Sequence, residues 1–491
     1  MPLLLRLAPA VLTVTSGARA AAQGDSVAFT PDTIRAFDGR AVAVDRLTLR
    51  VREPGAGNSV FEHRVVSLVM RGPDSTKRPP LVFLMGGPGI PASLIARVPP
   101  YLTLFERLRA SGDVVLLDQR GTGLSTPSLD CPAGAPPDSG LLLSLEHLTR
   151  DVARVYAACA GRLRAAGVPM EAYATAAVAE DVDRVRRALG SERVRLLGMS
   201  YGTLLALEYA ERFPDRVDRV ALQGAMGREH GARRPKELDA LFDRLAAAVA
   251  RDSVGMSLTS DLRRDVAALL RAFDARPRVV SFPDTKGDTV RLPVGGDRLR
   301  AVISGRLGDT RLPALVSTLK GGDARVLAQL VGSLYRDLAQ GGGPLFGRAM
   351  YCSSPPSEAR TRAARAEAAG TLLGPIFDNA VYEAAFCGEI GFRFARGDPP
   401  PLRPVARPAL IVGGTLDDRT PLDNAKDLLP VFARASLVTV ENGGHELLVE
   451  GDVREVVARF LAGDDVASLT LKHAGPHFAT VAEALAPPRR R

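Results

Sequence analysis

The sequence predicts an α/β fold, with a doubly wound, mostly parallel sheet that is interrupted by an inserted, mainly helical cap. Short runs that are apolar at every position, such as residues 81–84 and 114–117, end in glycine-rich turns, as buried parallel strands do. Segments with helical periodicity separate the expected strands, and this alternation is typical of a parallel sheet covered by helices. Between residues 228 and 400 the strand signal fades, and afterwards the alternation resumes.

The antiparallel edge strands are expected first in the chain, and the central strands of the sheet are expected after them. Residues 27–71 alternate apolar and polar side chains, which is typical of antiparallel strands at the edge of a sheet. Central strands follow, and we expect them at residues 81–84, 114–117, 194–197, 217–222, 409–414 and 437–440.

Helices are expected between these strands. Residues 148–163 and 178–189 carry apolar side chains at helical spacing, and Gly190 ends the second of these segments. A further helix follows Ser200, and the apolar face of residues 453–461 predicts a closing helix. Inside the cap, helical periodicity covers residues 237–250, 261–273, 324–338 and 357–373.

These patterns divide the chain into five parts. We expect a signal peptide at 1–22, the first part of the core at 23–227, the cap at 228–400, the second part of the core at 401–465 and a tail at 466–491. The leader combines Arg6, an apolar segment and small residues, so that cleavage is expected after Ala20 or Ala22. No apolar run approaches the roughly 20 residues that span a bilayer, so we expect a secreted or periplasmic protein without an integral membrane segment after cleavage.

The composition is that of an ordinary globular protein. Hydrophobic residues make up 46% of the 491 residues and charged residues 24%, which argues against disorder and coiled-coil structure. The net charge of +9 is spread along the chain, and the aromatic residues, 5% of the total, are scattered. A nucleic-acid-binding protein concentrates its basic residues on one face, so no nucleic-acid partner is expected.

The four cysteines support export. None of them lies in a C-x-x-C pair, which argues against a zinc site and against thioredoxin-like chemistry. With a leader present, two disulfides are expected, whereas a cytosolic protein would hold four buried thiols. Three pairings are open, and the one that is local in sequence closes two loops of moderate size. The four residues are Cys131, Cys159, Cys352 and Cys387.

Residues 198–202, Gly-Met-Ser-Tyr-Gly, match the pattern G-x-S-x-G at the junction of an expected strand and an expected helix. A nucleophile elbow requires this context, because the sharp turn projects the serine Oγ above the sheet. Glycines are needed on either side because the backbone approaches its neighbours too closely for a Cβ. The helix that starts at Tyr201 points its N-terminus at Ser200 and favours negative charge there. Ser200 is therefore the expected nucleophile.

A serine nucleophile needs a base, and the base needs an acid that orients it. In this kind of sheet the chain order is Ser, then Asp or Glu, then His. Of the six histidines, only His445 follows a late acid and lies on a loop after an expected strand, at 437–440. Asp417 follows the preceding expected strand and is the expected acid, with Asp418 as a turn or helix-capping residue.

The oxyanion hole is expected to use two backbone N–H groups. One belongs to Tyr201, and the other is assigned to Gly87 in the glycine-rich loop after the strand at 81–84. The alternative for this loop is a plain tight turn. The expected chemistry needs no metal and no cofactor.

Together these motifs carry a resemblance. Residues 85–89 (MGGPG), 118–123 (DQRGTG), 198–203 (GMSYGT), the turn at 417–421 and the Gly-Gly-His ending at His445 occur in that order. They resemble the α/β-hydrolase family of prolyl aminopeptidases and secreted tripeptidyl aminopeptidases. The match covers most of residues 75–227 and 400–465, whereas the cap is matched only by its position and by two of its cysteines.

The resemblance implies a secreted serine exopeptidase that removes residues, often proline, from peptide N-termini. It carries the catalytic triad onto Ser200, Asp417 and His445. The chain departs from the family at Met85, where many relatives have His, and at Asp418, where the tripeptidyl group often has Pro.

A third departure concerns the group that would bind a substrate's α-amine. Relatives commonly have an acidic residue shortly after the first cap cysteine, whereas Ser353-Ser354-Pro355 follows Cys352 here. Glu358, Glu383 and Glu389 are the substitutes that the cap offers.

The leading hypothesis is therefore an exopeptidase that acts on short peptides through an acyl-enzyme. The alternative is a carboxylesterase or another ester or amide hydrolase with the same triad, acting on small substrates, since an ester needs no amine-binding group. A non-catalytic binding protein that keeps the fold is a third hypothesis, and the complete Ser-Asp-His set argues against it.

Overall fold

The computed structural model describes residues 26–55, 59–73, 78–343, 345–374, 387–389 and 401–486. The expected signal peptide at 1–22 lies outside the described residues, and so does Glu383.

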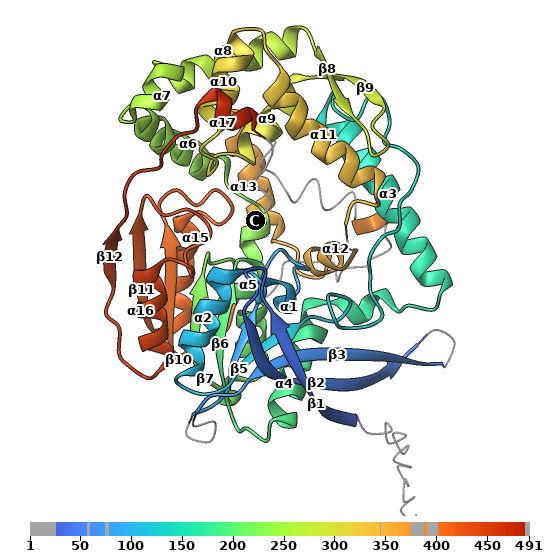
Figure 1. Ribbon diagram of the computed structural model, residues 1–491, viewed down its shortest axis with the longest axis vertical. Helices are drawn as coiled ribbons and strands as arrows, with labels where there is room; N and C mark the ends of the chain where they lie inside the picture. The colour runs from blue at the N-terminus through green and yellow to red at the C-terminus, as the bar shows by residue number, and fades with distance from the viewer. Residues whose placement is uncertain are drawn as a thin grey trace, which may run out of the picture.

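The core of the protein is one ten-stranded, mostly parallel sheet (Figure 1). In spatial order its strands are β1 (Ser26–Arg35), β2 (Ala41–Pro54), β3 (Val60–Met70), β5 (Val114–Asp118), β4 (Leu81–Leu84), β6 (Val194–Met199), β7 (Val217–Gln223), β10 (Val405–Gly414), β11 (Phe432–Glu441) and β12 (Leu469–Lys472). The first three strands pair antiparallel at one edge, and every pairing from β5 to β12 is parallel. The predicted fold class and the predicted antiparallel edge are confirmed.

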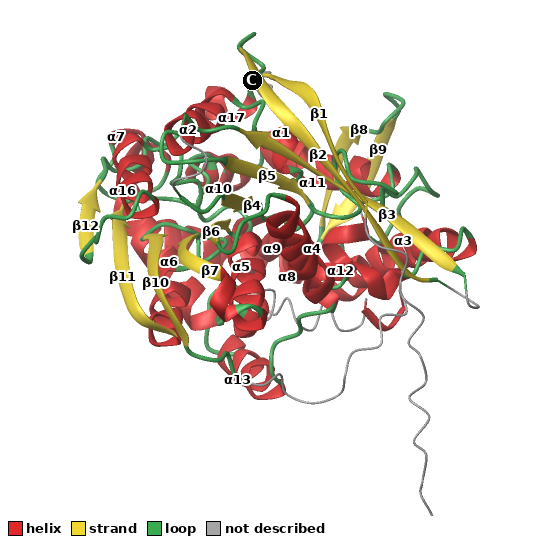
Figure 2. Ribbon diagram, turned by 90° about the horizontal axis from the view of Figure 1, so that it is seen from below, coloured by secondary structure: helices red, strands yellow, loops and turns green. Residues whose placement is uncertain are grey.

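Helices cover both faces of the sheet, as Figure 2 shows. In β4, Leu81 and Phe83 pack in one hydrophobic cluster, whereas Val82 and Leu84 pack in another. Successive side chains of a strand point to opposite faces, so this strand is buried on both sides. The first cluster includes α2 (Pro99–Arg109) and α16 (Gly451–Leu461), and the second includes α4 (Thr175–Ala188) and α5 (Tyr201–Arg212). The short helices α1 (Ala92–Ile95) and α15 (Leu422–Leu428) follow β4 and β10 in the chain.

The cap lies above the core in Figure 1. Its helices are α6 (Pro235–Val249), α7 (Ser253–Leu258), α8 (Leu262–Ala275), α9 (Gly296–Ser304), α10 (Leu312–Lys320), α11 (Arg325–Ala339), α12 (Leu345–Cys352) and α13 (Glu358–Ala368). Four of these, α6, α8, α11 and α13, fall where periodicity predicts helices. A hairpin of β8 (Arg278–Pro283) and β9 (Thr289–Val294) forms a separate two-stranded sheet, which was not predicted.

The expected core boundary at 227 does not describe how one segment packs. α3 (Leu145–Ala165) packs on α12 of the cap, and the loop before α3 is hydrogen-bonded to the cap. The N–H of Gly295 donates to the carbonyl of Leu142 at 2.9 Å, and the N–H of Leu345 donates to the carbonyl of Leu129 at 2.8 Å. Periodicity finds this helix but carries no information about which layer the helix joins.

The C-terminal segment expected as a tail at 466–491 contains two short elements. Residues 469–472 form β12, which extends the sheet by pairing with β11. α17 (Val481–Leu485) returns to the cap and packs on α10 and α11. β12 has only four residues and none of them is fully buried, so its apolar signal is too weak to be predicted from sequence.

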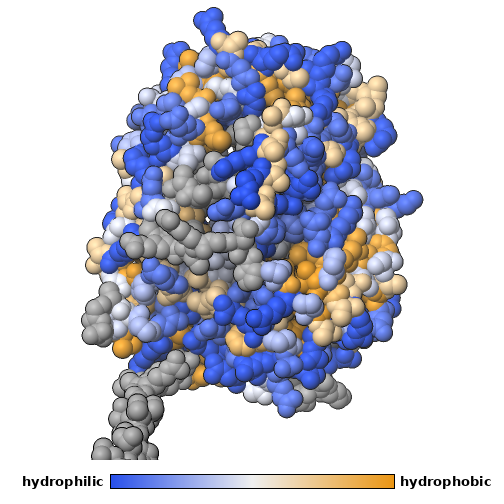
Figure 3. All heavy atoms as spheres, turned by 180° about the vertical axis from the view of Figure 1, so that it is seen from behind, coloured by the Kyte–Doolittle hydropathy of each residue, from blue (hydrophilic) through white to orange (hydrophobic). Residues whose placement is uncertain are grey.

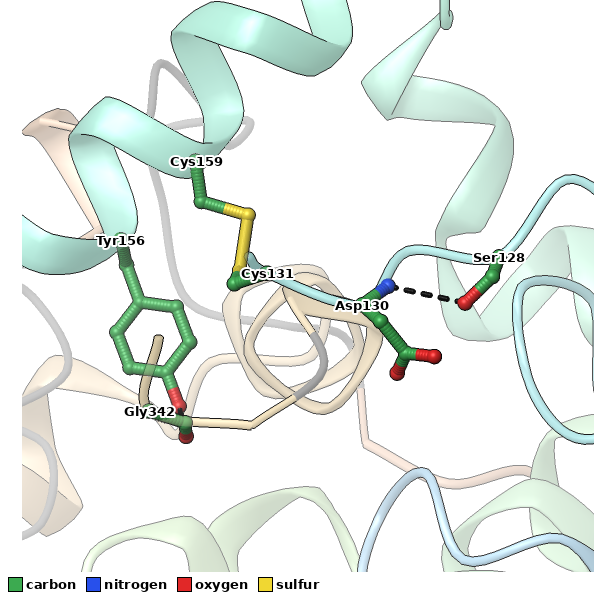
Figure 4. The surroundings of a disulfide bond; sticks show 6 residues. All are labelled: Ser128, Asp130, Cys131, Tyr156, Cys159 and Gly342. Carbon is green, nitrogen blue, oxygen red and sulfur yellow. Dashed lines mark hydrogen bonds between the residues drawn. A yellow bond between two sulfur atoms is a disulfide. The ribbon is translucent and has the colours of Figure 1, made fainter. Parts of the chain in front are cut away.

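The two disulfides join the cysteines that are neighbours in sequence. Cys131 is bonded to Cys159 of α3, and Cys352 of α12 is bonded to Cys387. Figure 4 shows the first bond next to Tyr156, whose hydroxyl donates to the carbonyl of Gly342. The disulfide and this hydrogen bond lie about one helical turn apart on α3 and tie the helix to two loops that pack against each other.

The surface is mixed in character. On the face shown in Figure 3, hydrophilic residues are interspersed with small groups of hydrophobic ones. Among the described helices, none combines the length and the apolar character that crossing a membrane requires.

Candidate active site

Ser200 lies in the sharp turn between β6 and α5, with φ 55° and ψ −124°. A positive φ is uncommon for a residue other than glycine, and such strain collects at functional sites. The glycines on either side are required by close packing. A Cβ on Gly198 would lie 2.6 Å from the carbonyl oxygen of Gly202, and a Cβ on Gly202 would overlap the carbonyl of Leu84 in β4. The turn therefore has the geometry that the G-x-S-x-G pattern predicts.

Asp417 and His445 lie side by side at the ends of β10 and β11. The His445 Nδ1 is 2.9 Å from both carboxylate oxygens of Asp417. Asp417 is almost completely buried, and it also accepts hydrogen bonds from the N–H groups of Arg419 and Thr420 and from the Thr420 hydroxyl. Burial acts to raise the pKa of Asp417, but His445 and the Thr420 donors together lower the pKa below its ordinary value.

This geometry determines the tautomer of His445. An ionised carboxylate can only accept hydrogen bonds, so Nδ1 carries the proton and donates it to Asp417. In the neutral imidazole the Nε2 atom is then the acceptor, and this is the form that a general base requires. Gln223 at the end of β7 fixes the backbone, because its Nε2 donates to the His445 carbonyl at 2.8 Å.

Ser200 and His445 line one cleft between the core and the cap, with a volume of about 330 Å³. That volume lies at the lower end of the range for small-molecule sites, roughly 300–1,000 Å³. One part of the wall is apolar and is made by Met85, Ile90, Met199, Met226 and Tyr351. The polar and charged part is made by His230, Arg233, Asp418, Arg419, Thr420, Asn424 and Glu446.

The two backbone donors expected in the oxyanion hole belong to Gly87 and Tyr201. Gly87 lines the cleft, and the N–H groups of Gly87 and Tyr201 form no hydrogen bond with any part of the chain that the structure describes. Gly86 packs directly on the turn, since a Cβ at this position would lie 2.7 Å from the Ser200 Cβ. Free N–H groups next to a serine are what an oxyanion hole requires.

The DQRGTG motif holds the glycine-rich loop in place. Gln119 donates from its Nε2 to the carbonyl of Met85 at 2.8 Å. Asp118 accepts from the N–H and the hydroxyl of Ser93 at 2.9 and 2.6 Å. The motif therefore positions the loop that carries Gly87.

A cluster of hydroxyl groups connects the nucleophile turn to the cap. The Thr175 Oγ1 lies 2.7 Å from the Tyr201 hydroxyl, 3.1 Å from the Ser353 Oγ and 2.8 Å from the Ser354 Oγ. The Tyr351 ring packs edge-on against the Tyr201 ring, with the centroids 5.3 Å apart. The serines that follow Cys352, where relatives carry an acidic residue, thus take part in joining core and cap.

Of the three cap glutamates singled out from the sequence, the two that the structure describes are not brought to the cleft. Glu358 and Glu389 are exposed, and neither is among the residues that line it. Instead, two acidic residues next to the triad line the cleft, Asp418 and Glu446. From the sequence, Asp418 was expected only as a turn or helix-capping residue and Glu446 was not considered, although their positions beside Asp417 and His445 were a signal.

His230 is the one other histidine in the cleft wall. Its Nδ1 accepts from the N–H of Gly227 at 2.8 Å, its Nε2 lies 3.4 Å from Asp427, and burial lowers its pKa. These contacts make it a structural residue. Within the described residues, no group of three or more His, Cys, Asp and Glu side chains is arranged to hold a metal ion.

Comparison with known proteins agrees with this geometry. The model of the alpha/beta hydrolase fold family matches residues 79–452, which is well over half of the chain. The chain belongs to the α/β-hydrolase family. The fold class that the sequence predicts is confirmed, and the family assignment places the protein among the hydrolases.

The relatives of this α/β hydrolase include peptidases, which confirms the resemblance carried by the motifs. The serine protease Hip1 of Mycobacterium tuberculosis is 32% identical over 155 residues, covering 30% of this chain and 29% of that protein. A tripeptidyl aminopeptidase of Streptomyces coelicolor is 30% identical over 164 residues, covering 32% of this chain and 30% of that protein. The chain thus spans less than a third of the length of these two relatives.

The chain also aligns with solved structures at low sequence identity. A proline iminopeptidase of Mycobacterium smegmatis aligns over 84% of this chain and 97% of its own, with 16% identity and a TM-score of 0.35.

Proposed function

We propose that this α/β hydrolase is an exported serine exopeptidase that releases residues from the N-termini of short peptides. The observation that carries the proposal is the pairing of His445 with the buried Asp417 in the same cleft as the strained Ser200. The peptidase names of the relatives support the substrate class.

In the first step the Ser200 Oγ attacks the scissile carbonyl carbon while the His445 Nε2 takes the hydroxyl proton. Asp417 holds the ring and stabilises the imidazolium that forms. The carbonyl oxygen becomes an oxyanion, and the N–H groups of Gly87 and Tyr201 stabilise it. Because these donors are already free and fixed, little reorganisation is needed as the charge develops.

In the second step the tetrahedral intermediate collapses. His445 gives its proton to the leaving amine and the C–N bond breaks. The C-terminal part of the substrate leaves as the amine, and the N-terminal part remains as an ester on Ser200. Water then attacks the ester with His445 as the base again, and the serine is regenerated. Atoms and charges balance without a metal or cofactor.

The cap supports an exopeptidase over an endopeptidase. A cleft of about 330 Å³ between the core and the cap accommodates a short peptide end and excludes a folded protein chain. Export is supported by the two disulfides, which are typical of oxidising compartments, and by the leader-like segment at 1–22.

The proposal is tested with the full chain, disulfides intact, on alanine, proline and Ala-Ala-Pro p-nitroanilides and on p-nitrophenyl butyrate. Ser200→Ala is expected to lower kcat by about 10⁴-fold or more and to abolish labelling by a fluorophosphonate. Ser257→Ala, at an exposed hydroxyl on α7, is the matched control. Full turnover by Ser200→Ala would disprove the serine mechanism. Turnover of the ester without turnover of any anilide would favour the carboxylesterase alternative.

A further inference from the structure

Asp418 is one of the residues that line the charged wall of the cleft, and its side chain is a carboxylate without a partner among the described residues. It forms no hydrogen bond or ion pair with any other described residue. Arg233 approaches only the main chain, since its Nη1 donates to the Asp418 carbonyl at 3.4 Å. Half-buried carboxylates are normally paired or hydrogen-bonded, so an unpaired one that faces a cleft is prepared for a cation from outside.

The position of Asp418 is fixed relative to the triad. Asp417, the preceding residue, is held by four donors including the His445 ring, and Arg419 and Thr420 supply three of them. The turn therefore has little freedom. The Asp418 carboxylate lies against Gly308 of the cap, because a Cβ on Gly308 would come within 2.8 Å of the Asp418 Oδ1. The absence of a side chain at Gly308 leaves the space that this carboxylate occupies.

Other charged groups in the cleft are less suited to bind a cation. Glu446 is exposed and accepts from the Tyr101 hydroxyl at 3.4 Å. Arg233 and Arg419 are positive and would repel an ammonium group. Asp418 is thus the half-buried, unpaired negative group in the wall.

We propose that Asp418 binds the free α-ammonium group of the substrate and makes this enzyme specific for peptide N-termini. This inference rests on the aminopeptidase function proposed above and goes beyond it by naming the side chain that binds the α-ammonium group. An ammonium group is the cation that every N-terminal substrate carries, and a fixed carboxylate binds it by charge-assisted hydrogen bonds. Acetylation removes both the charge and two of the donors.

The test compares kcat/KM for Ala- and Ala-Ala-Pro-p-nitroanilide with that for the same compounds N-acetylated. The wild-type ratio of free to acetylated substrate is expected to be roughly 10- to 100-fold, the range for a hydrogen-bonded charge. In Asp418→Asn the ratio falls to about one, mainly through the free-amine substrates. Asp418→Glu keeps the charge and is expected to restore part of the ratio.

The controls separate this inference from the function on which it rests. Asp423→Asn removes a carboxylate five residues away that pairs with Lys426 outside the cleft, and the ratio should persist. A wild-type ratio that persists in Asp418→Asn, or that is lost instead in Glu446→Gln, would overturn the role of Asp418 and leave the aminopeptidase intact. A wild-type ratio near one, with Ser200 still labelled by a fluorophosphonate, would overturn both amine recognition and the aminopeptidase. Asp418→Ser is the second variant, should the asparagine variant not fold.

Discussion

The Gln223 side chain supports His445, because its Nε2 donates a 2.8 Å hydrogen bond to the main-chain carbonyl of that residue. The main-chain carbonyl of Gln223 in turn accepts from the N–H of Ser200 at 2.9 Å. Gln223 is completely buried at the end of β7, between the strands that carry the nucleophile and the acid. A single residue thus links the backbones of the proposed nucleophile and the proposed base.

Gln223→Leu is expected to lower kcat by about 10- to 100-fold with a smaller effect on KM. The substitution leaves the His445 carbonyl without this donor and lets the loop shift, which misplaces Nε2 relative to Ser200. Steady-state kinetics on p-nitrophenyl butyrate measure the effect. Gln329→Leu is the control, because Gln329 also donates to a carbonyl, that of Leu485, but on the surface of the cap. Equal kcat values for the two variants would contradict a role for Gln223 in positioning His445.

The contrast between the triad residues and Gln223 shows what the sequence could and could not predict. The elbow was predictable because its glycines, its serine and its flanking strand and helix are contiguous, and their spacing is dictated by local backbone packing. Asp417 and His445 were predictable because chain order and strand ends restrict the choice. The contact of Gln223 with His445 joins residues 222 positions apart and depends on β7 lying beside β10. No local pattern carries that information.

The charged wall of the cleft illustrates the same limit. Asp417 and Asp418 are chemically identical neighbours, and only the direction of each side chain separates an acid that meets His445 from a carboxylate that faces the cleft. Likewise, the serines after Cys352 contact Thr175 because the cap folds back over the core. These relationships arise from tertiary packing, which periodicity does not describe.

Gly202→Ala is expected to destabilise the protein severely, by about 3 kcal/mol or more, because its Cβ would overlap the backbone of Leu84 and a backbone cannot move aside as a flexible side chain can. Gly161→Ala is the matched control, since Gly161 also lies in a helix but has open space around it. There the change is expected to stabilise by roughly 0.5–1 kcal/mol. Thermal unfolding of the two variants measures the difference. A similar Tm for both would contradict the packing described for the elbow.

Thr175→Val is expected to weaken the connection between the nucleophile turn and the cap. The fully buried Tyr201 hydroxyl loses its 2.7 Å partner, which costs about 1–3 kcal/mol of stability. The Thr175 Oγ1 also contacts the Ser354 Oγ of the cap, so its loss should loosen the cleft wall. We therefore expect KM to rise more than kcat falls. Thr149→Val, which removes a hydroxyl bonded only within α3, is expected to leave both constants unchanged. A fall in kcat alone would instead indicate damage to the oxyanion donors.

The ionisation of Glu53 is expected to make the free energy of unfolding depend on pH in the acidic range. Burial acts to raise the pKa of Glu53, but His63, 3.4 Å away, and the buried Arg120 together lower it to about 2 from an ordinary 4.5. Because the folded-state pKa is the lower one, the ionised carboxylate contributes its full stabilisation above about pH 4.5. That contribution is lost as the pH falls toward 2.

The stability difference between wild type and Glu53→Gln should therefore shrink by roughly 2 kcal/mol between pH 6 and pH 3, at about 1.4 kcal/mol per pH unit below 4.5. Urea unfolding at the two pH values measures it. Glu62→Gln is the control, because Glu62 pairs with Arg52 at an exposed position on the same pair of strands, where screening leaves little to lose. If the Glu53→Gln difference were the same at both pH values, the carboxylate would not be held ionised by Arg120 and His63. The pH dependence of unfolding would then have to come from other carboxylates with lowered pKa values, such as Asp417, whose titration would remove activity together with stability.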